Sequence, residues 1–442
     1  MKVAIVGSGI AGLAVAHTLH GLAEITLLEA GDHFGGHSHT VDITLATPQE
    51  RPDRGAKPPT SFGVDTGFAV FNEHSYPNLV NLLTELGVAT APSQMSFSVQ
   101  LPGALNGHKL EWSSSSPSAV FAHHTNLLNW RFLRMLGELA RFKALASGLA
   151  RRAQDAELMQ PLAHFLRQHR FSDEFRDWCL LPLVGCIWSC PTEQALEFPL
   201  ATVIRFIQRH GLLQLGRRPP WRTVVGGARH YVDRITARIA DRRLNTPVRL
   251  IERDAAGVRV LTDGAAERFD KLVLATHADQ SLALLREPSA SERATLGAIR
   301  FQPNRAVLHT DATVLPDSRR AWAAWNYERA QGADRASARV GLHCLLNRLQ
   351  PLPAAQPVLL SLSPLREIAP EQVLAEWDYA HPVFDLAAVR AQADMTSLQG
   401  RQHSYFCGAW MGDGSHEDGL KAGLAVAREL LIEAARHEAG TA

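Results

Sequence analysis

The sequence predicts a two-domain α/β protein, and three observations lead to that prediction. The chain has 442 residues, more than one simple core usually needs, so two domains are the natural expectation. A glycine-rich turn joins a short apolar run to a helical pattern within the first twenty residues. Near the other end, a second apolar run ends in a glycine and precedes another helical pattern. Both ends therefore have the strand–turn–helix order of α/β domains.

The first apolar run, residues 2–6, suits a strand that is buried on both faces. Gly7, Gly9 and Gly12 follow in a GxGxxG spacing. Gly7 permits a tight turn, Gly9 lets the backbone approach a pyrophosphate, and Gly12 lets the helix pack close to the strand. The first residues of the helix offer free N–H groups to the phosphates; they are Ile10 and Ala11. We predict a dinucleotide site, with a purely structural turn as the alternative.

The second predicted strand, residues 25–28, ends in Glu29. An acid at this position accepts hydrogen bonds from the ribose hydroxyl groups of an adenosine and disfavours a 2′-phosphate. Residues 29–37 read Glu-Ala-Gly-Asp-His-Phe-Gly-Gly-His. This resembles the ExxxxxGG(R) extension of flavoproteins of the glutathione-reductase and amine-oxidase type, which favours FAD over NAD.

The resemblance implies that Gly35 and Gly36 pass beside the pyrophosphate and that Ala30 lies next to the ribose acid. The relatives often carry an arginine after the glycine pair, whereas this chain has His37. That difference weakens the charge contact with phosphate, although an imidazole can still donate a hydrogen bond. The alternative is an ordinary surface turn.

The middle of the chain has a glycine pair at 226–227, a helical stretch, and apolar runs at 248–252, 257–260 and 269–276. We expect a helix, a hairpin-like excursion, and a strand that returns to the first sheet. By resemblance, Val248 contacts adenine through its backbone, and the end of the returning strand passes the phosphates. A further segment would lie along the flavin ring. The residues implied are Ala275 and Thr276 for the phosphates, and Thr66, Gly67 and Phe68 for the ring.

Residues 404–410 predict a strand that ends at Gly408, followed by a glycine turn and a helix from Glu417. This resembles the closing segment of flavin amine oxidases, in which a helix N-terminus points at the pyrimidine edge of the flavin. The first turn of that helix would hold the flavin through Asp418, Gly419 and Leu420. The acid that usually follows the strand glycine is Ala409 here, so we assign its ribityl contact to Asp413. Cys407 lies in the strand, so we expect non-covalent FAD.

The whole chain resembles the flavin-containing amine oxidoreductase superfamily and, more narrowly, a bacterial group of predicted NAD/FAD-binding proteins. The segments that carry the resemblance are spread over nearly the full length: 65–73, 76–79, 95–98, 187–189, 206–213, 221–224, 275–277, 325–327 and 416–419. It implies a two-domain FAD-binding (glutathione-reductase/amine-oxidase-like) fold. A discontinuous Rossmann-type FAD domain would comprise 1–80, 223–298 and 400–442. An interleaved α+β substrate domain would comprise 81–222 and 299–399.

Members of that bacterial group are often associated with fatty-acyl-modifying methyltransferases, which favours a lipid-like substrate. We expect FAD-dependent dehydrogenation or desaturation of an apolar, fatty-acyl substrate. The alternatives are a flavin amine oxidase, a redox-neutral flavin isomerase and, least favoured, a non-catalytic FAD-binding factor. Arg305 falls near a lysine of the monoamine oxidases, which puts amine oxidation in doubt because arginine keeps its proton; a surface or ion-paired arginine is the alternative. Trp325, Tyr327 and Trp410 are candidate pocket residues, and simple core positions are the alternative for Trp325 and Tyr327.

Composition narrows the remaining possibilities. The net charge of +1 gives no global reason to expect nucleic acid as a partner. Five cysteines without CxxC pairs and twenty histidines without HExxH spacing predict neither a disulfide framework nor a metal site. Met1–Lys2 leads straight into a predicted strand, and no apolar run approaches twenty residues. We expect a cytoplasmic protein that takes a small-molecule or lipid substrate.

Two basic stretches suggest peripheral contact with the inner face of a membrane. A predicted helix over 119–153 carries six arginine or lysine residues among leucines and phenylalanines, and a second basic cluster spans 205–222. Such surfaces suit docking on anionic phospholipid. A solvated helix is the simpler alternative, and the sequence leaves the oligomeric state open.

Overall fold

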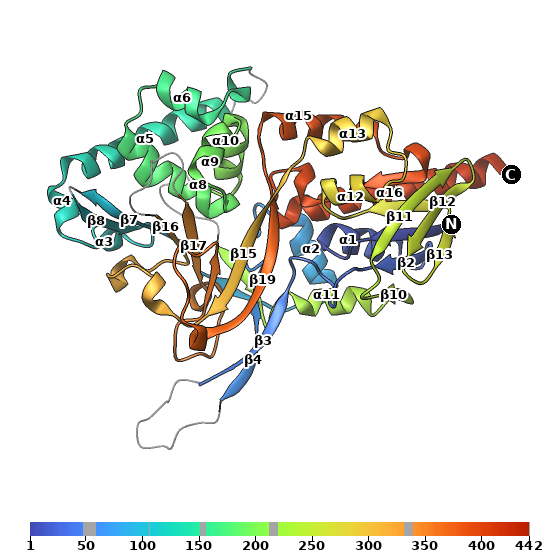
Figure 1. The fold of residues 1–442 in the computed structure, drawn as a ribbon, viewed down its shortest axis with the longest axis horizontal. Coiled ribbons are helices and arrows are strands. Elements are labelled where there is room, and N and C mark those ends of the chain that lie inside the picture. Colours follow the sequence, from blue (N-terminus) through green and yellow to red (C-terminus); the bar gives the residue numbers. More distant parts are fainter. Residues whose placement is uncertain (47–58, 106, 151–155, 212–219, 331–338, 442) are drawn as a thin grey trace.

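The computed structural model describes residues 1–46, 59–105, 107–150, 156–211, 220–330 and 339–441 (Figure 1). Within these residues the chain forms a parallel sheet and a larger mixed sheet, with helices packed around both. The fold is therefore the predicted α/β fold, with a Rossmann-like sheet beside a mixed sheet that belongs to the substrate side.

The parallel sheet has the strand order β10–β2–β1–β14–β20. Its strands come from three distant parts of the chain because the middle and the C-terminal segment return to it. They are β1 (Lys2–Val6), β2 (Glu24–Leu28), β10 (Asp241–Arg243), β14 (Lys271–Leu274) and β20 (Ser404–Phe406). In β1, Val3, Ala4 and Ile5 are fully buried, as expected for a strand covered on both faces.

Helices α1 (Ile10–Leu19) and α16 (His416–Thr441) pack against each other beside this sheet (Figure 1). The antiparallel sheet β11–β12–β13 lies on its other side, and its residues share a buried cluster with β14 and β20. Those strands are β11 (Val248–Asp254), β12 (Gly257–Thr262) and β13 (Ala266–Phe269). The predicted excursion and returning strand are thus confirmed.

The mixed sheet has the order β19–β15–β18–β17–β16–β7–β8, and only the β16–β7 pair is parallel. The strands are β7 (Phe97–Leu105), β8 (His108–Ser113), β15 (Phe301–His309), β16 (Trp325–Arg329), β17 (Val340–Leu345), β18 (Leu359–Leu362) and β19 (Val373–Pro382). Helices α5 (Trp130–Ala150), α6 (Leu162–Gln168), α8 (Leu181–Trp188), α9 (Thr192–Glu197) and α10 (Leu200–Arg209) gather on this side of the molecule (Figure 1).

Smaller elements join the two sides. The strands are β3 (Thr40–Leu45) with β4 (Thr60–Asp65), and β5 (Phe71–Asn72), β9 (Trp221–Val224) and β6 (Thr90–Ser93). The helices are α2 (Pro77–Glu85), α7 (Asp173–Phe175), α11 (Arg229–Thr236), α12 (Ala278–Leu284), α13 (Ala290–Gly297), α14 (Leu346–Leu349) and α15 (Leu386–Asp394). The β5–β9–β6 sheet crosses the domain limits expected near residues 80 and 222, so those limits stay a prediction.

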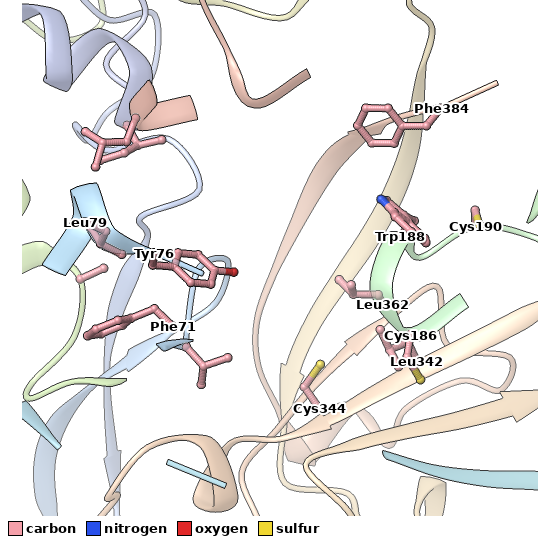
Figure 2. Packing of buried hydrophobic residues seen from close by; sticks show 14 of the residues in the cluster. Phe71, Tyr76, Leu79, Cys186, Trp188, Cys190, Leu342, Cys344, Leu362 and Phe384 are labelled. Atoms are coloured by element: carbon pink, nitrogen blue, oxygen red, sulfur yellow. The ribbon is translucent and has the colours of Figure 1, made fainter. Parts of the chain in front are cut away.

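One buried cluster runs through both sides of the molecule. It includes residues of β1 and α1 together with α8 and the mixed sheet. Figure 2 shows part of it: Phe71, Tyr76 and Leu79 lie on one side, and a group around Leu342 and Leu362 lies on the other. The two sheets therefore share apolar packing, which holds the parts of the site in fixed relative positions.

The predicted continuous helix over 119–153 is wrong. The stretch is divided into α3 (Pro117–Val120), α4 (Thr125–Leu128) and α5. The break has a local cause, because Asn129 Oδ1 accepts hydrogen bonds from the N–H groups of Arg131 (3.0 Å) and Phe132 (3.2 Å) and so starts a new helix. No helix of the described residues is long and apolar enough to cross a bilayer.

Candidate functional site

The candidate site begins where the parallel strands end. Strand β1 lies between β2 and β14, so the order of the strands reverses at β1. Ligands of open α/β sheets bind outside the carboxyl ends of the strands at such a switch point. The loops that leave this edge are 7–9, 29–36, 275–277 and 407–415.

The first loop has the geometry that its glycines predict. Gly7 has a φ of +97°, and a Cβ there would lie 2.9 Å from the carbonyl oxygen of Ala275. A Cβ on Gly12 would overlap the carbonyl oxygen of Gly7. At Gly9, by contrast, a Cβ would meet no atom within 4 Å, and no side chain caps the helix that starts at Ile10. The open space beside an uncapped helix N-terminus fits a phosphate group.

Glu29 is held at the end of β2 by hydrogen bonds from two neighbouring loops. Its Oε2 accepts from the N–H (3.0 Å) and the hydroxyl (2.6 Å) of Ser8, and its Oε1 accepts from the N–H of Gly31 (2.9 Å). Backbone bonds from Asn245 to Gly31 (2.8 Å) and from Thr246 to Glu29 (2.9 Å) bring the start of β11 beside the acid. The predicted adenine contact, Val248, thus begins the strand that lies next to the predicted ribose acid.

The second glycine pair packs back onto the first loop. The N–H of Gly35 donates to the carbonyl (3.1 Å) and the hydroxyl (3.1 Å) of Ser8, and a Cβ on Gly36 would lie 3.2 Å from the Cα of Gly9. Both glycines have positive φ, +115° and +55°. The turn is therefore part of the same cradle rather than a separate surface turn.

His37, at the position of the family arginine, is a neutral imidazole. Burial, reinforced by His381 and His277, lowers its pKa to about 3. Its ring centroid lies 5.6 Å from that of His381 and 6.5 Å from that of His277. Its Nε2 is buried without a hydrogen-bond partner in the described structure. A buried polar atom without a partner at the phosphate loops fits contact with a polar group of a bound cofactor.

The segment expected along the flavin ring lies beside the second loop. The N–H of Thr66 donates to the carbonyl of His39 (2.9 Å), and the N–H of Phe68 donates to that of His37 (2.7 Å). A Cβ on Gly67 would overlap the carbonyl oxygen of His37, which explains the glycine.

The Phe68 ring stacks on His416 with centroids 3.9 Å apart. His416 Nε2 is 2.9 Å from the Tyr231 hydroxyl, and burial lowers the pKa of His416 to about 3. Tyr231 in turn donates to Ser38 Oγ (2.5 Å). The first residue of the closing helix is thus fixed against the segment predicted to contact the flavin.

Acidic side chains organise the N-terminus of α16. Asp418 Oδ2 accepts from the hydroxyl (2.7 Å) and N–H (3.2 Å) of Ser415 and from the N–H of Asp413 (3.0 Å). Arg209 lies 3.0 Å from the Asp413 carboxylate and 3.1 Å from that of Asp418. Burial raises the pKa of Asp413. The ribityl contact assigned to Asp413 stays a prediction, and its carboxylate already faces a guanidinium.

Sequence reasoning missed the role of Glu417. This residue is buried, and its carboxylate accepts from the N–H (3.1 Å) and side-chain amide (2.6 Å) of Asn78 and from the N–H of Leu79 (3.1 Å). The Glu417 carboxylate therefore caps the N-terminus of α2, where its negative charge interacts favourably with the positive end of the helix dipole. The acid run at 417–418 was visible in the sequence, but its partner at 78 lies far away in the chain.

The structure places Trp410 in the protein interior. Only 2 % of Trp410 is exposed, and its indole N–H donates to the carbonyl of Thr276 (3.0 Å). A Cβ on Gly408 would overlap this indole, so the strand glycine makes room for it. Trp410 thus joins the ends of β14 and β20 in the interior, and its assignment to a pocket stays a prediction.

A cavity of about 390 Å³ lies between α8 and the mixed sheet. Its walls include Gly185, Tyr327, Leu342, Leu362 and Leu365, and its polar lining includes Gln302 and Asn304. The side-chain amide of Asn304 lies 2.8 Å from His381 Nδ1. Asn304 of the cavity lining thus contacts His381, whose ring neighbours that of His37.

Arg305 and Trp325 differ in their surroundings. Arg305 lines the same cavity, but its side chain is 57 % exposed and its guanidinium forms a two-pronged ion pair with Glu376 (2.8 and 3.1 Å). The structure thus gives Arg305 the ion-paired alternative. Trp325 is half-buried, its indole nitrogen has no hydrogen-bond partner in the described structure, and it shares a sheet face with Tyr327. It is not among the residues that line this cavity.

The switch-point loops, the two glycine pairs and the fixed acid at the end of β2 define an α/β protein that binds a dinucleotide. The chain belongs to the flavin containing amine oxidoreductase family, whose model matches residues 10–431. It is therefore an oxidoreductase of this family, and the family implies FAD as its flavin. The residues at the switch point fit such a group, given the open space at Gly9 and the unpaired His37 Nε2.

Three solved structures share the fold over almost the whole chain. A putrescine oxidase bound to putrescine has a TM-score of 0.69 and 16% identity, covering 98% of this chain and 99% of its own. A CLA-producing fatty acid isomerase from P. acnes has a TM-score of 0.65 and 16% identity, covering 97% and 98%. A cyclohexylamine oxidase from Brevibacterium oxydans has a TM-score of 0.62 and 17% identity, covering 97% and 99%. No curated protein matches the sequence.

Proposed function

We propose that the protein dehydrogenates or desaturates an apolar, fatty-acyl-like substrate by hydride transfer to non-covalently bound FAD. The observation that carries the proposal is the lining of the cavity beside α8. Apolar and aromatic side chains form most of its walls, and among the described residues its charged lining consists of Arg305, which is paired with Glu376, and Arg339, without an Asp or Glu. An ammonium group would find no carboxylate in this lining, whereas an acyl chain with a carboxylate or phosphate head would meet apolar walls and Arg339.

The residues proposed to hold FAD are those of the switch point. The pyrophosphate would be faced by Gly7, Gly9, Ile10, Ala11, Gly12, Gly35, Gly36, His37, Ala275 and Thr276. The adenosine would be faced by Glu29, Ala30 and Val248. The flavin part would be faced by Thr66, Gly67, Phe68, Gly408, Asp413, Asp418, Gly419 and Leu420. The bound flavin supplies the hydride acceptor. The residues of the chain would bind the flavin, orient the substrate and exclude water from the site.

Buried, neutral groups support both the dry site and the non-covalent cofactor. Burial lowers the pKa of His381 to about 4 and keeps its imidazole uncharged at neutral pH. Cys407 is fully buried, and burial raises the pKa of its thiol to about 12. A thiol in that state is a poor nucleophile for attachment to a flavin methyl group.

A second candidate is a redox-neutral isomerase of fatty acyl chains. It is favoured by the likeness to the fatty acid isomerase from P. acnes, at 16% identity. Amine oxidation is favoured by the likeness to the putrescine and cyclohexylamine oxidases, and is opposed by the lack of a carboxylate among the described residues that line the cavity.

The test is anaerobic flavin reduction. The purified holoprotein is mixed with total lipid extract, fatty acids or a panel of amines while flavin absorbance is followed. We expect bleaching by the lipid fraction and a product that has lost two hydrogens by mass spectrometry. Bleaching by amines alone would overturn the proposal. A product of unchanged mass with a moved double bond, without bleaching, would establish the isomerase.

A cavity-filling variant links the reaction to this cavity. Gly185 and Tyr327 both line the cavity, and a Cβ on Gly185 would lie 3.0 Å from the Tyr327 ring, so Gly185→Leu crowds this wall of the cavity. We expect the bleaching rate to fall roughly a hundredfold at unchanged flavin content, because small displacements of a substrate are costly. Gly137→Leu, at a helical glycine with open space around it, is the matched control. Equal bleaching by the two variants would show that the substrate binds elsewhere.

A further inference from the structure

Four large apolar side chains are exposed within seven residues where α4 meets α5. Leu127 is 48 % exposed, Leu128 90 %, Trp130 66 % and Leu133 45 %. We call these four residues the α4–α5 corner. The other exposed large apolar residues of the described chain are far apart in sequence: Met1, Leu22, Val225 and Ile432. Single exposed leucines are ordinary on protein surfaces, but a group of this kind marks an interaction site.

The fold holds this corner outward. Asn126 is buried and donates to the carbonyl of Glu111 (3.0 Å), which anchors α4 on β8. On the first turns of α5, Phe132 and Met135 are fully buried. With 3.6 residues per turn, burying those two leaves Trp130 and Leu133 on the opposite side. The exposed positions are therefore a consequence of a packed inner face and not of a loosely attached helix.

The exposed charged groups at the corner are guanidinium groups, whose partner carboxylates are largely buried. Residues 112–137 contain no Asp or Glu and carry Arg131 and Arg134. Arg131 is paired with Glu174 (2.7 Å). Arg134 is 47 % exposed and lies 3.7 Å from Glu138, whose side chain is largely buried. An apolar surface with a tryptophan and a cationic rim is the chemistry that enters the headgroup region of an anionic bilayer.

Position and charge favour a bilayer over a second copy of the chain. Figure 1 shows α4 at the edge of the molecule opposite to both termini, where an extended flat surface can reach it. A symmetric contact between two copies would bring the same cationic patch against itself. From these observations we propose that the α4–α5 corner docks on the surface of an anionic phospholipid membrane. The proposal does not depend on which reaction the flavin site performs.

The test is flotation of the full-length holoprotein with vesicles of phosphatidylcholine alone or with 30 mol % phosphatidylglycerol (roughly the anionic fraction that attracts basic segments). We expect binding to the anionic vesicles, weaker binding to neutral ones, and a decrease with added salt. The triple variant Leu127→Ser, Leu128→Ser, Trp130→Ser should lose at least about tenfold in partition, because each residue gives up apolar burial in the bilayer.

The matched control is Leu22→Ser with Ile432→Ser, which removes exposed apolar side chains elsewhere on the surface. This variant should bind vesicles like the unmodified protein. Flavin absorbance and circular dichroism establish that each variant is folded. No vesicle binding by the unmodified protein, or equal binding by the triple variant, overturns the proposal. So does a change from dimer to monomer in the triple variant without an effect on vesicle binding, which would assign the corner to a second copy.

Discussion

At the scale of single residues, the decisive group is the acid at the end of β2. Glu29 accepts three hydrogen bonds from Ser8 and Gly31, which occupy part of its lone-pair capacity and fix its direction. The remaining capacity is available for ribose hydroxyl groups. Because charged hydrogen bonds are stronger than neutral ones, the carboxylate stabilises the loop, and we predict that it also contributes to cofactor binding.

We predict that Glu29→Gln weakens FAD retention by at least about tenfold, corresponding to the loss of one charge-assisted hydrogen bond. The measurement is the flavin fluorescence that appears when the holoprotein is diluted. Glu24→Gln is the control, since Glu24 begins the same strand and contacts only Lys2 at 4.0 Å. Equal release from both variants would contradict a ribose contact at Glu29.

Residue identity alone did not show what surrounds Trp410 and Arg305. Both were assigned from their position in the family pattern, whereas the direction of a side chain is set by its neighbours in the fold. Trp410 fills space next to Gly408 and donates to Thr276, and Arg305 pairs with Glu376 of another strand. Thr276 and Glu376 lie far in sequence from the residues that they contact.

At the scale of elements, the close contact between α1 and α16 positions both helix N-termini at the site. Glycines make that contact possible. A Cβ on Gly423 would overlap the carbonyl oxygen of Ala11, and a Cβ on Gly419 would lie 2.8 Å from Ile10. Gly419 was predicted as a flavin contact, whereas the packing role of Gly423 was missed because its partner helix lies more than four hundred residues earlier.

We predict that Gly423→Ala destabilises the protein by about 1–3 kcal/mol, since the added methyl group forces the helices apart. Urea unfolding followed by circular dichroism measures the free energy of unfolding, and flavin content should fall in parallel. Gly137→Ala is the control: its site in α5 is open, and the substitution should stabilise by about 0.5–1 kcal/mol. A Gly423→Ala variant as stable as the parent would show that the helices are not in close contact.

At the scale of the whole molecule, buried ionisable groups connect the two sheets. Asp65 accepts from Thr40 (2.6 Å), the N–H of Ala228 (2.8 Å) and the amide of Gln350 (2.9 Å), so it joins three distant segments. Burial raises the pKa of Asp65 to about 6. Burial shifts the pKa of several histidines in the other direction, because it disfavours the charged imidazolium: it lowers the pKa of His210, His309 and His381 to about 4.

These shifts predict a loss of stability in mild acid. A histidine with a folded pKa near 4 and an ordinary value of 6.5 takes up a proton only in the unfolded chain between those values. The free energy of unfolding therefore falls as the pH decreases from about 6.5 to about 4. Asp65 acts in the opposite direction between about 4 and 6, and Asp413, whose pKa is also raised, acts in the same sense as Asp65, but these two carboxyl groups are outnumbered by the buried histidines.

The variant His309→Gln tests the predicted loss of stability in mild acid. It should reduce the slope of unfolding free energy against pH by about 1.4 kcal/mol per pH unit between pH 4.5 and 6, the value for one proton. His309 contacts Ser361 (2.7 Å), so the variant is compared at each pH with His20→Gln, an exposed histidine. Parallel slopes for the two variants would remove His309 as a source of the acid sensitivity.

The sequence by itself determined the parallel sheet, the glycine cradle, the acid at the end of β2, the returning strand and the closing helix. These are local patterns: a strand buried on both faces reads as an apolar run, and a phosphate loop needs glycines at fixed spacing. Only the tertiary structure decided the capping of α2 by Glu417, the interior position of Trp410 and the cavity beside α8. Each of these three depends on contacts between residues remote in the chain, and burial or charge pairing at such contacts leaves no periodic signal in the sequence.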